Sequence, residues 1–511
     1  MPVYLSVACC FPFARQRVIT RSQTRSNALA WISLPAEIRL MILEIVACQK
    51  YPGWASLASV CREWQHVLEK VNFHKIKLRV PCLAKFRRYA TPQKRELIRH
   101  ICLDVVLPQY NSKCCSRRRS PSARISCIVS DGIWKLFSIL RTWGPAKNLA
   151  LEINVYSPSD CEHCFKNIYL SSDAVNDEDA MTDAWRTGSR YHDPQHGWMH
   201  GRQVEAPPRT AILQLFRPIH LVFHRKLPQV QAVTCLIIRR QFRRCISPSG
   251  LGLLLSRFNR LEHIFYEPWL PYEAVRRESH EKWLSAVMRD NLPNTLNKLT
   301  VFEDSYEFYD LFPERRAPVP WFNLFEPSKG LGAAFASKSL DLQHLAISFM
   351  VNAEEFFRHC QSTWIWSSLQ SLALTSQLLQ NDWAKRDQIE ALLYRAGLLA
   401  QKMPELRTFV LWNGGKNHAC AFIYRADRER ASVTWRGTWL LELRRPEFKP
   451  WQLAAAKIPC HRFSELRVKQ ELVRGVIRSH GDAIHHLKLP CQVIDPRSLW
   501  QIRREAYSIA E

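Results

Sequence analysis

The residue types best suited to acid–base chemistry gather near the C-terminus. Arg478-Ser479-His480-Gly481-Asp482 is followed by His485-His486, and an imidazole beside a carboxylate can move protons at neutral pH. No nucleophile is fixed beside this group by the sequence pattern. We therefore favour a structural interpretation, in which these polar residues form a loop before a short strand that begins at Ile484.

One C-x-x-C motif, Cys161-Glu162-His163-Cys164, contains residue types that bind metals. A structural zinc ion needs four ligands in a tetrahedral arrangement. Cys114-Cys115 offers the nearest further thiols, but adjacent cysteines seldom ligate one ion. The sequence also lacks a nucleophile elbow, a phosphate-binding loop and a zinc-protease motif. We therefore predict a protein with no catalytic residue, no metal site and no cofactor.

The charge balance of the chain is strongly basic. Its 511 residues include 72 Lys and Arg against 46 Asp and Glu, which gives a formal net charge of +26. Such a surplus favours acidic partners, and nucleic acid is one of them. The basic residues are scattered rather than grouped, so solvated faces account for most of them. Association with nucleic acid is therefore kept as an alternative function.

Targeting and membrane signals are weak along the chain. The 17 cysteines follow no regular framework and there is no secretory signal, which favours reduced thiols in the cytoplasm, the nucleus or both. No apolar stretch has the length of a membrane span, so we expect no membrane partner. Residues 1–36 contain no acidic residue. We expect a disordered basic leader over residues 1–29, and a mitochondrial presequence is the alternative.

Three short helices are predicted between residues 30 and 75. Pro35 suits the first turn of a helix, and apolar residues then recur at helical spacing until the breaker Tyr51-Pro52-Gly53. A second helix begins near Trp54, and a third contains Trp64. A bundle of this size buries little core alone, so we expect it to pack against a partner helix or a following domain.

The same residues resemble an F-box. The resemblance rests on Leu34-Pro35-x-Glu37-Ile38-x-x-x-Ile42-Leu43 and Leu57-Ala58-x-Val60-Cys61-Arg62-x-Trp64, and it covers about residues 30–75. In that family the module docks on the Skp-family adaptor of an SCF-type cullin–RING ubiquitin ligase. The alternative is that these side chains are all buried in the chain's own core. The adaptor-binding positions that the resemblance implies are Leu34, Pro35, Ile38, Ile42, Leu43, Leu57, Val60, Cys61 and Trp64.

Downstream, a pattern of one apolar residue, two spacers and then apolar–x–apolar recurs, often after a helical stretch and a break. This succession predicts an irregular leucine-rich-repeat-like α/β solenoid over residues 95–505. The intervals are uneven and no Asn recurs at the usual ladder position, so an ordinary layered α/β domain is the alternative. The copies are Ile98/Ile101/Leu103, Leu149/Leu151, Val233/Leu236/Ile238, Leu261/Ile264, Leu296/Leu299/Val301, Leu342/Leu345/Ile347, Leu369/Leu372/Leu374, Leu406/Phe409/Leu411 and Ile484/Leu487/Leu489.

Two segments interrupt this pattern. Residues 171–210 and 303–330 are rich in acidic residues and prolines, so we expect loop insertions there. Near the C-terminus, the stretches 418–425 and 432–435 predict a β-hairpin. We expect Trp435 and Trp439 to pack in the core beside it.

Over nearly its full length the chain resembles a group of uncharacterised fungal F-box proteins. The expected fold class is α/β, with a three-helix F-box followed by a leucine-rich-repeat-like solenoid with loop insertions. The resemblance implies a substrate-recognition subunit that binds a Skp adaptor and an unknown protein substrate for ubiquitin-dependent degradation. A basic scaffold protein without a ligase role is the alternative. The shared segments are Tyr156-Ser157-Pro158-Ser159-Asp160, Ser337–Val351, Trp412-Asn413-Gly414-Gly415-Lys416 and Arg478–Asp482.

Overall fold

The protein was analysed as a computed structural model. The structure describes residues 31, 33–49, 54–112, 122–146, 148–170, 192–271, 274–305, 329–427, 430–441, 445–457 and 466–506. The predicted basic leader over 1–29, most of the first predicted insertion (171–191) and most of the second (306–328) lie outside the described residues. Within the described part, no helix is both long and apolar enough to cross a lipid bilayer.

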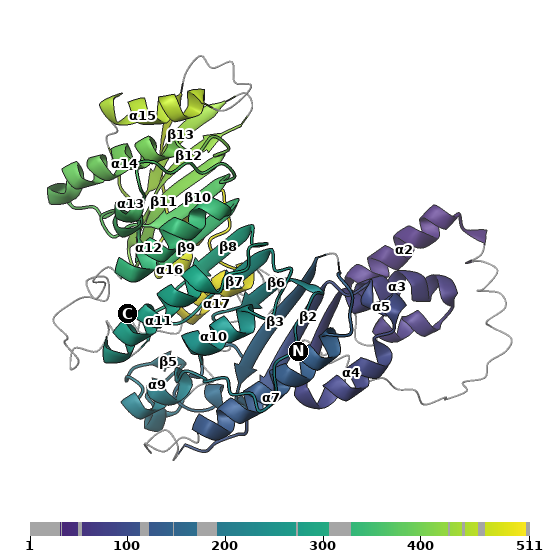
Figure 1. Ribbon diagram of the computed structural model, residues 1–511. Helices are drawn as coiled ribbons and strands as arrows, with labels where there is room; N and C mark the ends of the chain where they lie inside the picture. Colours follow the sequence, from purple (N-terminus) through teal and green to yellow (C-terminus); the bar gives the residue numbers. More distant parts are fainter. Residues whose placement is uncertain are drawn as a thin grey trace.

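Three short helices open the described chain at one end of the molecule (Figure 1). They are α2 (Ala36–Gln49), the 3-10 helix η1 (Trp54–Ser59) and α3 (Arg62–His74). Helix α2 begins directly after Pro35, whose carbonyl accepts a hydrogen bond from the backbone N–H of Arg39 at 3.1 Å. Helix α3 continues without a loop into the first strand, β1 (Lys75–Arg79), which precedes the predicted start of the second domain at residue 95.

Twelve strands form one large sheet, and their spatial order follows their order in the chain (Figure 1). All neighbouring strands are parallel except β11–β12 and β12–β13, which are antiparallel. Besides β1, the strands are β2 (His100–Val106), β3 (Leu149–Tyr156), β6 (Val233–Ile238), β7 (His263–Tyr266), β8 (Lys298–Phe302), β9 (His344–Asn352), β10 (Ser371–Thr375), β11 (Thr408–Gly415), β12 (His418–Ala426), β13 (Ala431–Gly437) and β14 (Arg467–Leu472).

Helices link the parallel strands, because a parallel pair needs a crossover connection between its ends. The main core lies between these helices and one face of the sheet, where aliphatic side chains from alternate strand positions are buried. The helices are α4 (Leu83–Tyr89), α5 (Pro92–Arg95), α7 (Ser122–Leu140), α9 (Arg209–Leu215), α10 (Pro248–Leu255), α11 (Ala274–Asp290), α12 (Lys329–Lys338), α13 (Ala353–His359), α14 (Arg386–Ala400) and α15 (Arg445–Ala456).

The C-terminal helices cover part of the opposite face of the sheet. Phe409 and Leu411 of β11 point into the main core, whereas Val410 and Trp412 belong to a second core. Helix α16 (His480–Leu487) contacts β11 and β12 there, and α17 (Pro496–Ala506) packs against α16. The chain therefore folds back over its own sheet after β14.

Most of the predicted strands are confirmed, and one is wrong. The first eight copies of the apolar pattern contribute to β2, β3 and β6–β11. The ninth, at Ile484, lies in helix α16 instead. Ser479 caps this helix by accepting a hydrogen bond from the backbone N–H of Asp482 at 3.3 Å. Ile484 and Leu487 are three residues apart, so they share one helical face as easily as they fit a strand pattern.

The predicted β-hairpin is confirmed as β12–β13, with Trp435 fully buried and Trp439 nearly so. The first predicted insertion is only partly a loop. Its described portion contains a small two-stranded sheet, β4 (Trp198–Met199) and β5 (Arg202–Gln203). The indole Nε1 of buried Trp198 donates a hydrogen bond to the carbonyl of Cys164 at 3.0 Å, which fixes this sheet against the domain.

Candidate protein-docking surface

Helix α2 exposes a row of large apolar side chains. Ile38, Met41 and Ile45 are 42%, 56% and 55% exposed, and their spacing places them on one side of the helix. The other side contains Leu43 and Ala47, which are buried. Helix α2 thus has one apolar side that packs within the protein and a second apolar side that faces solvent.

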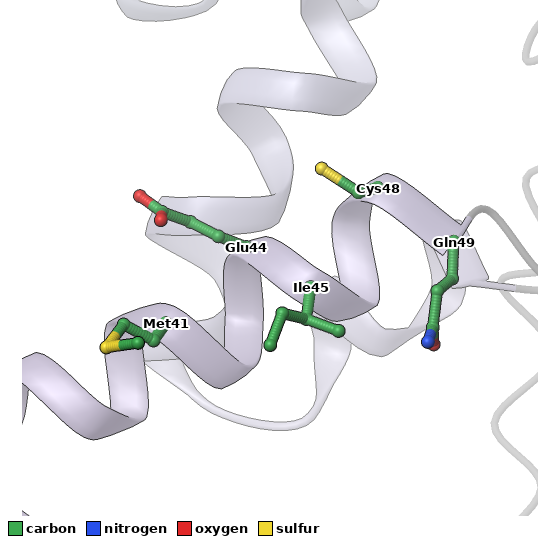
Figure 2. Close-up of a pocket in the computed structure, with 5 residues that line it drawn as sticks. All are labelled: Met41, Glu44, Ile45, Cys48 and Gln49. Atoms are coloured by element: carbon green, nitrogen blue, oxygen red, sulfur yellow. The ribbon is translucent and has the colours of Figure 1, made fainter.

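A second exposed apolar position lies where η1 meets α3. Val60 is 61% exposed, and the adjacent Cys61 is also exposed. On α2 itself, a shallow pocket is lined by residues of this one helix, and Figure 2 shows how their side chains project from successive turns. The lining residues are Met41, Glu44, Ile45, Cys48 and Gln49. We call Ile38, Met41, Ile45 and Val60 the apolar docking surface.

A cluster of polar and aromatic contacts fixes α2 against α3. Arg39 of α2 donates from Nε to Glu63 Oε1 at 2.9 Å, and Trp31 donates from its indole nitrogen to Glu63 Oε2 at 3.1 Å. Hydrogen bonds from Trp31 and Arg39 hold the pKa of Glu63 below its ordinary value. The rings of Trp31 and Trp64 lie 5.4 Å apart. These contacts set the angle at which α2 presents its exposed side.

The nine predicted adaptor-binding residues do not share one environment. Leu43 is completely buried, so it packs within the protein. Met41 and Ile45 were not among the nine, yet they are more exposed than Ile38; their spacing from Ile38 was the signal in the sequence that could have identified them. The exposed members of the nine are Pro35, Ile38, Val60 and Cys61, and the half-buried ones are Leu34, Ile42, Leu57 and Trp64.

His480 and Asp482, which we predicted to lie in a loop, are instead buried in the first turn of α16, whereas His485 is exposed. His480 Nε2 lies 3.2 Å from Asp304 Oδ1, and its ring stacks on Phe302. Asp482 accepts a hydrogen bond from Arg503 Nε at 3.0 Å. His480 therefore ties α16 to the end of β8, while Asp482 ties it to α17. Neither side chain is accessible to a substrate in this arrangement.

Two segments that were singled out in the sequence meet at this point. A Cβ atom added to Gly414 of β11 would lie 2.4 Å from the Cβ of Ala483 in α16. Carbon atoms cannot approach that closely. Glycine in the Trp412–Lys416 segment and a small residue after the Arg478–Asp482 segment are therefore required for helix α16 to lie directly on β11.

Among the described residues, the C-x-x-C motif has no neighbours that would complete a metal cluster. Cys164 is buried, and Cys161 Sγ donates to the carbonyl of Pro158 at 3.4 Å. Within the part of the chain that the structure describes, no group of three or more His, Cys, Asp or Glu side chains is arranged to hold a metal ion. Cys114-Cys115 lies outside the described residues.

A buried ionic network went unrecognised in the sequence. Arg239, Arg240, Arg243 and Arg244 follow β6, and all four are at most 5% exposed. Arg244 makes two hydrogen bonds to Asp160, at 2.5 and 2.6 Å, and Arg239 Nε lies 3.0 Å from Asp495. These four basic residues are thus internal and add nothing to the net positive charge, because acidic residues from distant parts of the chain neutralise them.

The fold and the exposed helical side define a mixed α/β protein with a sequentially ordered, mostly parallel sheet and an apolar surface suited to binding another polypeptide. Residues 291–495 match the model of a family described as a family of unknown function (DUF6546). This stretch runs from the end of α11 through β8–β14 and α16, and it excludes the N-terminal helices. No curated protein matches the chain.

Proposed function

We propose that this chain is the substrate-recognition subunit of an SCF-type ubiquitin ligase. In this proposal the helices α2, η1 and α3 are an F-box that binds a Skp-family adaptor, and the sheet domain holds a protein substrate. The chain contributes binding only, while other subunits transfer ubiquitin. Its place of action would be the cytoplasm or the nucleus, where such ligases work.

The observation that carries the proposal is the solvent exposure of Ile38, Met41 and Ile45 on α2. An amphipathic helix normally turns its apolar side toward its own core. Helix α2 already packs against the rest of the protein through Leu43 and Ala47, so its second apolar side is not needed for that packing. Contiguous exposed apolar groups of this kind mark sites where another polypeptide binds.

The arrangement of the sheet supports the substrate-binding half of the proposal. Each successive strand is added beside its predecessor, and helices cover one face. That is the arrangement expected of an irregular leucine-rich-repeat-like solenoid, in which each unit contacts its neighbours. Such domains use the strand-lined face for binding. Because α3 runs directly into β1, the helical module and the sheet would be joined without a flexible linker.

The proposal is tested by co-expressing the full-length chain with a Skp-family adaptor and purifying the complex. The wild-type chain should retain the adaptor, and the double variant Ile38→Glu/Ile45→Glu should lose it. Both side chains are exposed, so the variant should keep the wild-type melting temperature. Val476→Glu is the control, because Val476 is more exposed than either residue but follows β14, outside the helical module.

Two results would overturn the proposal. One is the absence of a complex with the folded wild-type chain. The other is a complex that survives Ile38→Glu/Ile45→Glu as well as it survives Val476→Glu.

A further inference from the structure

A row of basic side chains crosses the sheet at the point where the parallel strands begin. One residue from each strand contributes, and consecutive members are paired in register. Seven of the twelve are Lys, Arg or His, and none is acidic. In order from β1 to β14, the members of this basic row are Lys75, His100, Ala150, Cys235, His263, Lys298, His344, Ser371, Thr408, Arg425, Ser432 and Arg467.

The basic row lies on the face of the sheet opposite the main core. The residues that follow His263, Lys298 and His344 in their strands are Ile264, Leu299 and Leu345, which are buried under the helices. Side chains alternate between the two faces of a strand. The row therefore points to the other face, and its members from Cys235 to His344 are partly exposed there.

A lysine lies between two histidines at the centre of the row. His263, Lys298 and His344 occupy neighbouring strands, about 4.8 Å apart. Burial lowers the pKa of His263, and the charge of Lys298 lowers it further. Burial and Lys298 also lower the pKa of His344. Within the described residues, none of the three side chains makes an ion pair or a hydrogen bond.

In the described part of the chain, the acidic side chains near the row form no ion pair with the three central side chains. Glu152 bonds His100 at 2.8 Å and also pairs with Arg239, and Asp495 pairs with Arg239. Glu262, which precedes His263, raises the pKa of His263 through its charge, against the lowering by burial and Lys298. The Lys298 ammonium group, with the N–H groups of the two flanking imidazoles, is thus left to attract an anionic group from outside the chain.

We propose that the basic row binds an acidic segment of a partner polypeptide, held in an extended conformation across β7, β8 and β9. If the proposed function holds, that segment belongs to the substrate. The row supplies one ammonium group at its centre and imidazole N–H donors on the neighbouring strands, at a spacing set by the sheet, so it matches carboxylates or phosphates carried on a chain rather than a single ion. No member of the row is Phe, Tyr or Trp, whereas surfaces for single-stranded nucleic acid combine positive charge with the stacking of bases on such rings.

Fluorescence anisotropy with the full-length chain tests this proposal. The labelled probes are a fifteen-residue glutamate-rich peptide, the same peptide with phosphoserine at half of the glutamate positions, and a glutamine-rich peptide. We expect both acidic peptides to bind at least tenfold more tightly than the glutamine-rich one, and the tighter of the two identifies carboxylate or phosphate as the preferred group. Lys298→Glu should weaken this binding at least tenfold.

Lys282→Glu is the matched control, because Lys282 is an exposed residue of α11, on the helical side of the sheet. It should change the dissociation constant less than twofold. The circular dichroism spectrum and melting temperature of each variant show whether it is folded. If Lys298→Glu does not fold, His263→Gln/His344→Gln replaces it, with the same expected direction.

Three outcomes would overturn the proposal. The first is equal affinity for the acidic and glutamine-rich peptides, and the second is equal weakening of peptide binding by Lys298→Glu and Lys282→Glu. The third is a single-stranded oligonucleotide that binds more tightly than either acidic peptide and loses this binding in Lys298→Glu. Adaptor co-purification is measured on the same variants. Loss of peptide binding with the adaptor retained would leave the ligase proposal intact. Peptide binding by a chain that never binds the adaptor would leave the row as a peptide site and remove the ligase role.

Discussion

The guanidinium of Arg240 lies 2.8 Å from the carboxylate of Glu505, and this contact joins the segment after β6 to the C-terminal helix α17. Arg243 bonds the other oxygen of Glu505, and both guanidinium groups lie over the ring of Trp269, at 4.7 and 4.3 Å from its centre. Both arginines are almost fully buried. The last described helix is therefore fastened to the sheet by two buried guanidinium groups and a carboxylate that is only slightly exposed to water.

The first prediction concerns Glu505. Glu505→Gln should lower the free energy of unfolding by about 2–4 kcal/mol, because Arg243 loses a charged partner while it stays buried. Urea denaturation gives this value. Glu471→Gln is the control, since Glu471 pairs with Arg436 at a more exposed site and should cost about 1 kcal/mol or less. Equal losses in the two variants would contradict the importance of the buried network.

The second prediction concerns the close approach of Gly414 and Ala483. Gly414→Ala should lower the free energy of unfolding by about 1–3 kcal/mol, because the added methyl group forces α16 away from β11. Gly144→Ala should be nearly neutral, since nothing lies within 4 Å of the position its Cβ would take. These values come from chemical denaturation.

A double-mutant cycle isolates the contact between these two residues. Combining Gly414→Ala with Ala483→Gly should cost less than the sum of the two single changes by about 0.5 kcal/mol or more, because the second change makes room for the methyl group. If the two changes in the free energy of unfolding were strictly additive, the two sites would not interact.

The third prediction concerns Trp451 of α15. Its buried ring lies 5.0–5.1 Å from the rings of Phe409, Phe422 and Tyr424, and its Nε1 donates to the carbonyl of Leu393 at 3.1 Å. Trp451→Ala should cost about 3–5 kcal/mol of stability. Trp283→Ala, at a 63% exposed position on α11, should cost little. Comparable melting temperatures for the two variants would contradict the packing of α15.

The sequence predicted the strands well because each one is marked locally. Leu342, Leu345 and Ile347 repeat the pattern found before and after them, and the helix and break that precede many copies add to the signal. The same pattern failed at Ile484, where spacing alone fits either structure. There the cap formed by Ser479 and Asp482 was the local signal that favoured a helix.

Other features depend on pairings that no local pattern encodes. The stretch Arg239–Arg244 has the composition of a solvated basic segment, and it is buried only because Glu152, Asp304 and Glu505 come from distant elements. On α2, helical periodicity identified the apolar residues. It did not distinguish the side that packs inside, at Leu43, from the side that faces solvent, at Ile45. That distinction requires the position of α3.

The last prediction concerns how the free energy of unfolding changes at acidic pH. Burial alone would raise the pKa of Glu152, but the charge of Arg239 and the hydrogen bond from His100 outweigh it, and its pKa lies well below the ordinary value of 4.5. The pKa of Asp304 is lowered in the same way, because the charge of Arg240 and the contacts with His480 outweigh the effect of burial. At pH values above their ordinary pKa values, both carboxylates therefore contribute their full stabilisation to the fold. That stabilisation is lost as the pH falls below about 4.5, because the unfolded chain then binds protons that the folded chain does not.

Urea titrations between pH 6 and pH 3 measure this effect. Below about pH 4.5, the free energy of unfolding should fall with decreasing pH, and Glu152 alone should account for up to about 1.4 kcal/mol per pH unit. Glu152→Gln removes one of the protons taken up on unfolding, so its slope should be shallower even though its stability at pH 6 is lower. Asp304→Asn serves as the second variant. Slopes identical to that of the wild type in both variants would show that neither carboxylate is held in its charged form by the arginines, and the ionic account of this face of the sheet would fail.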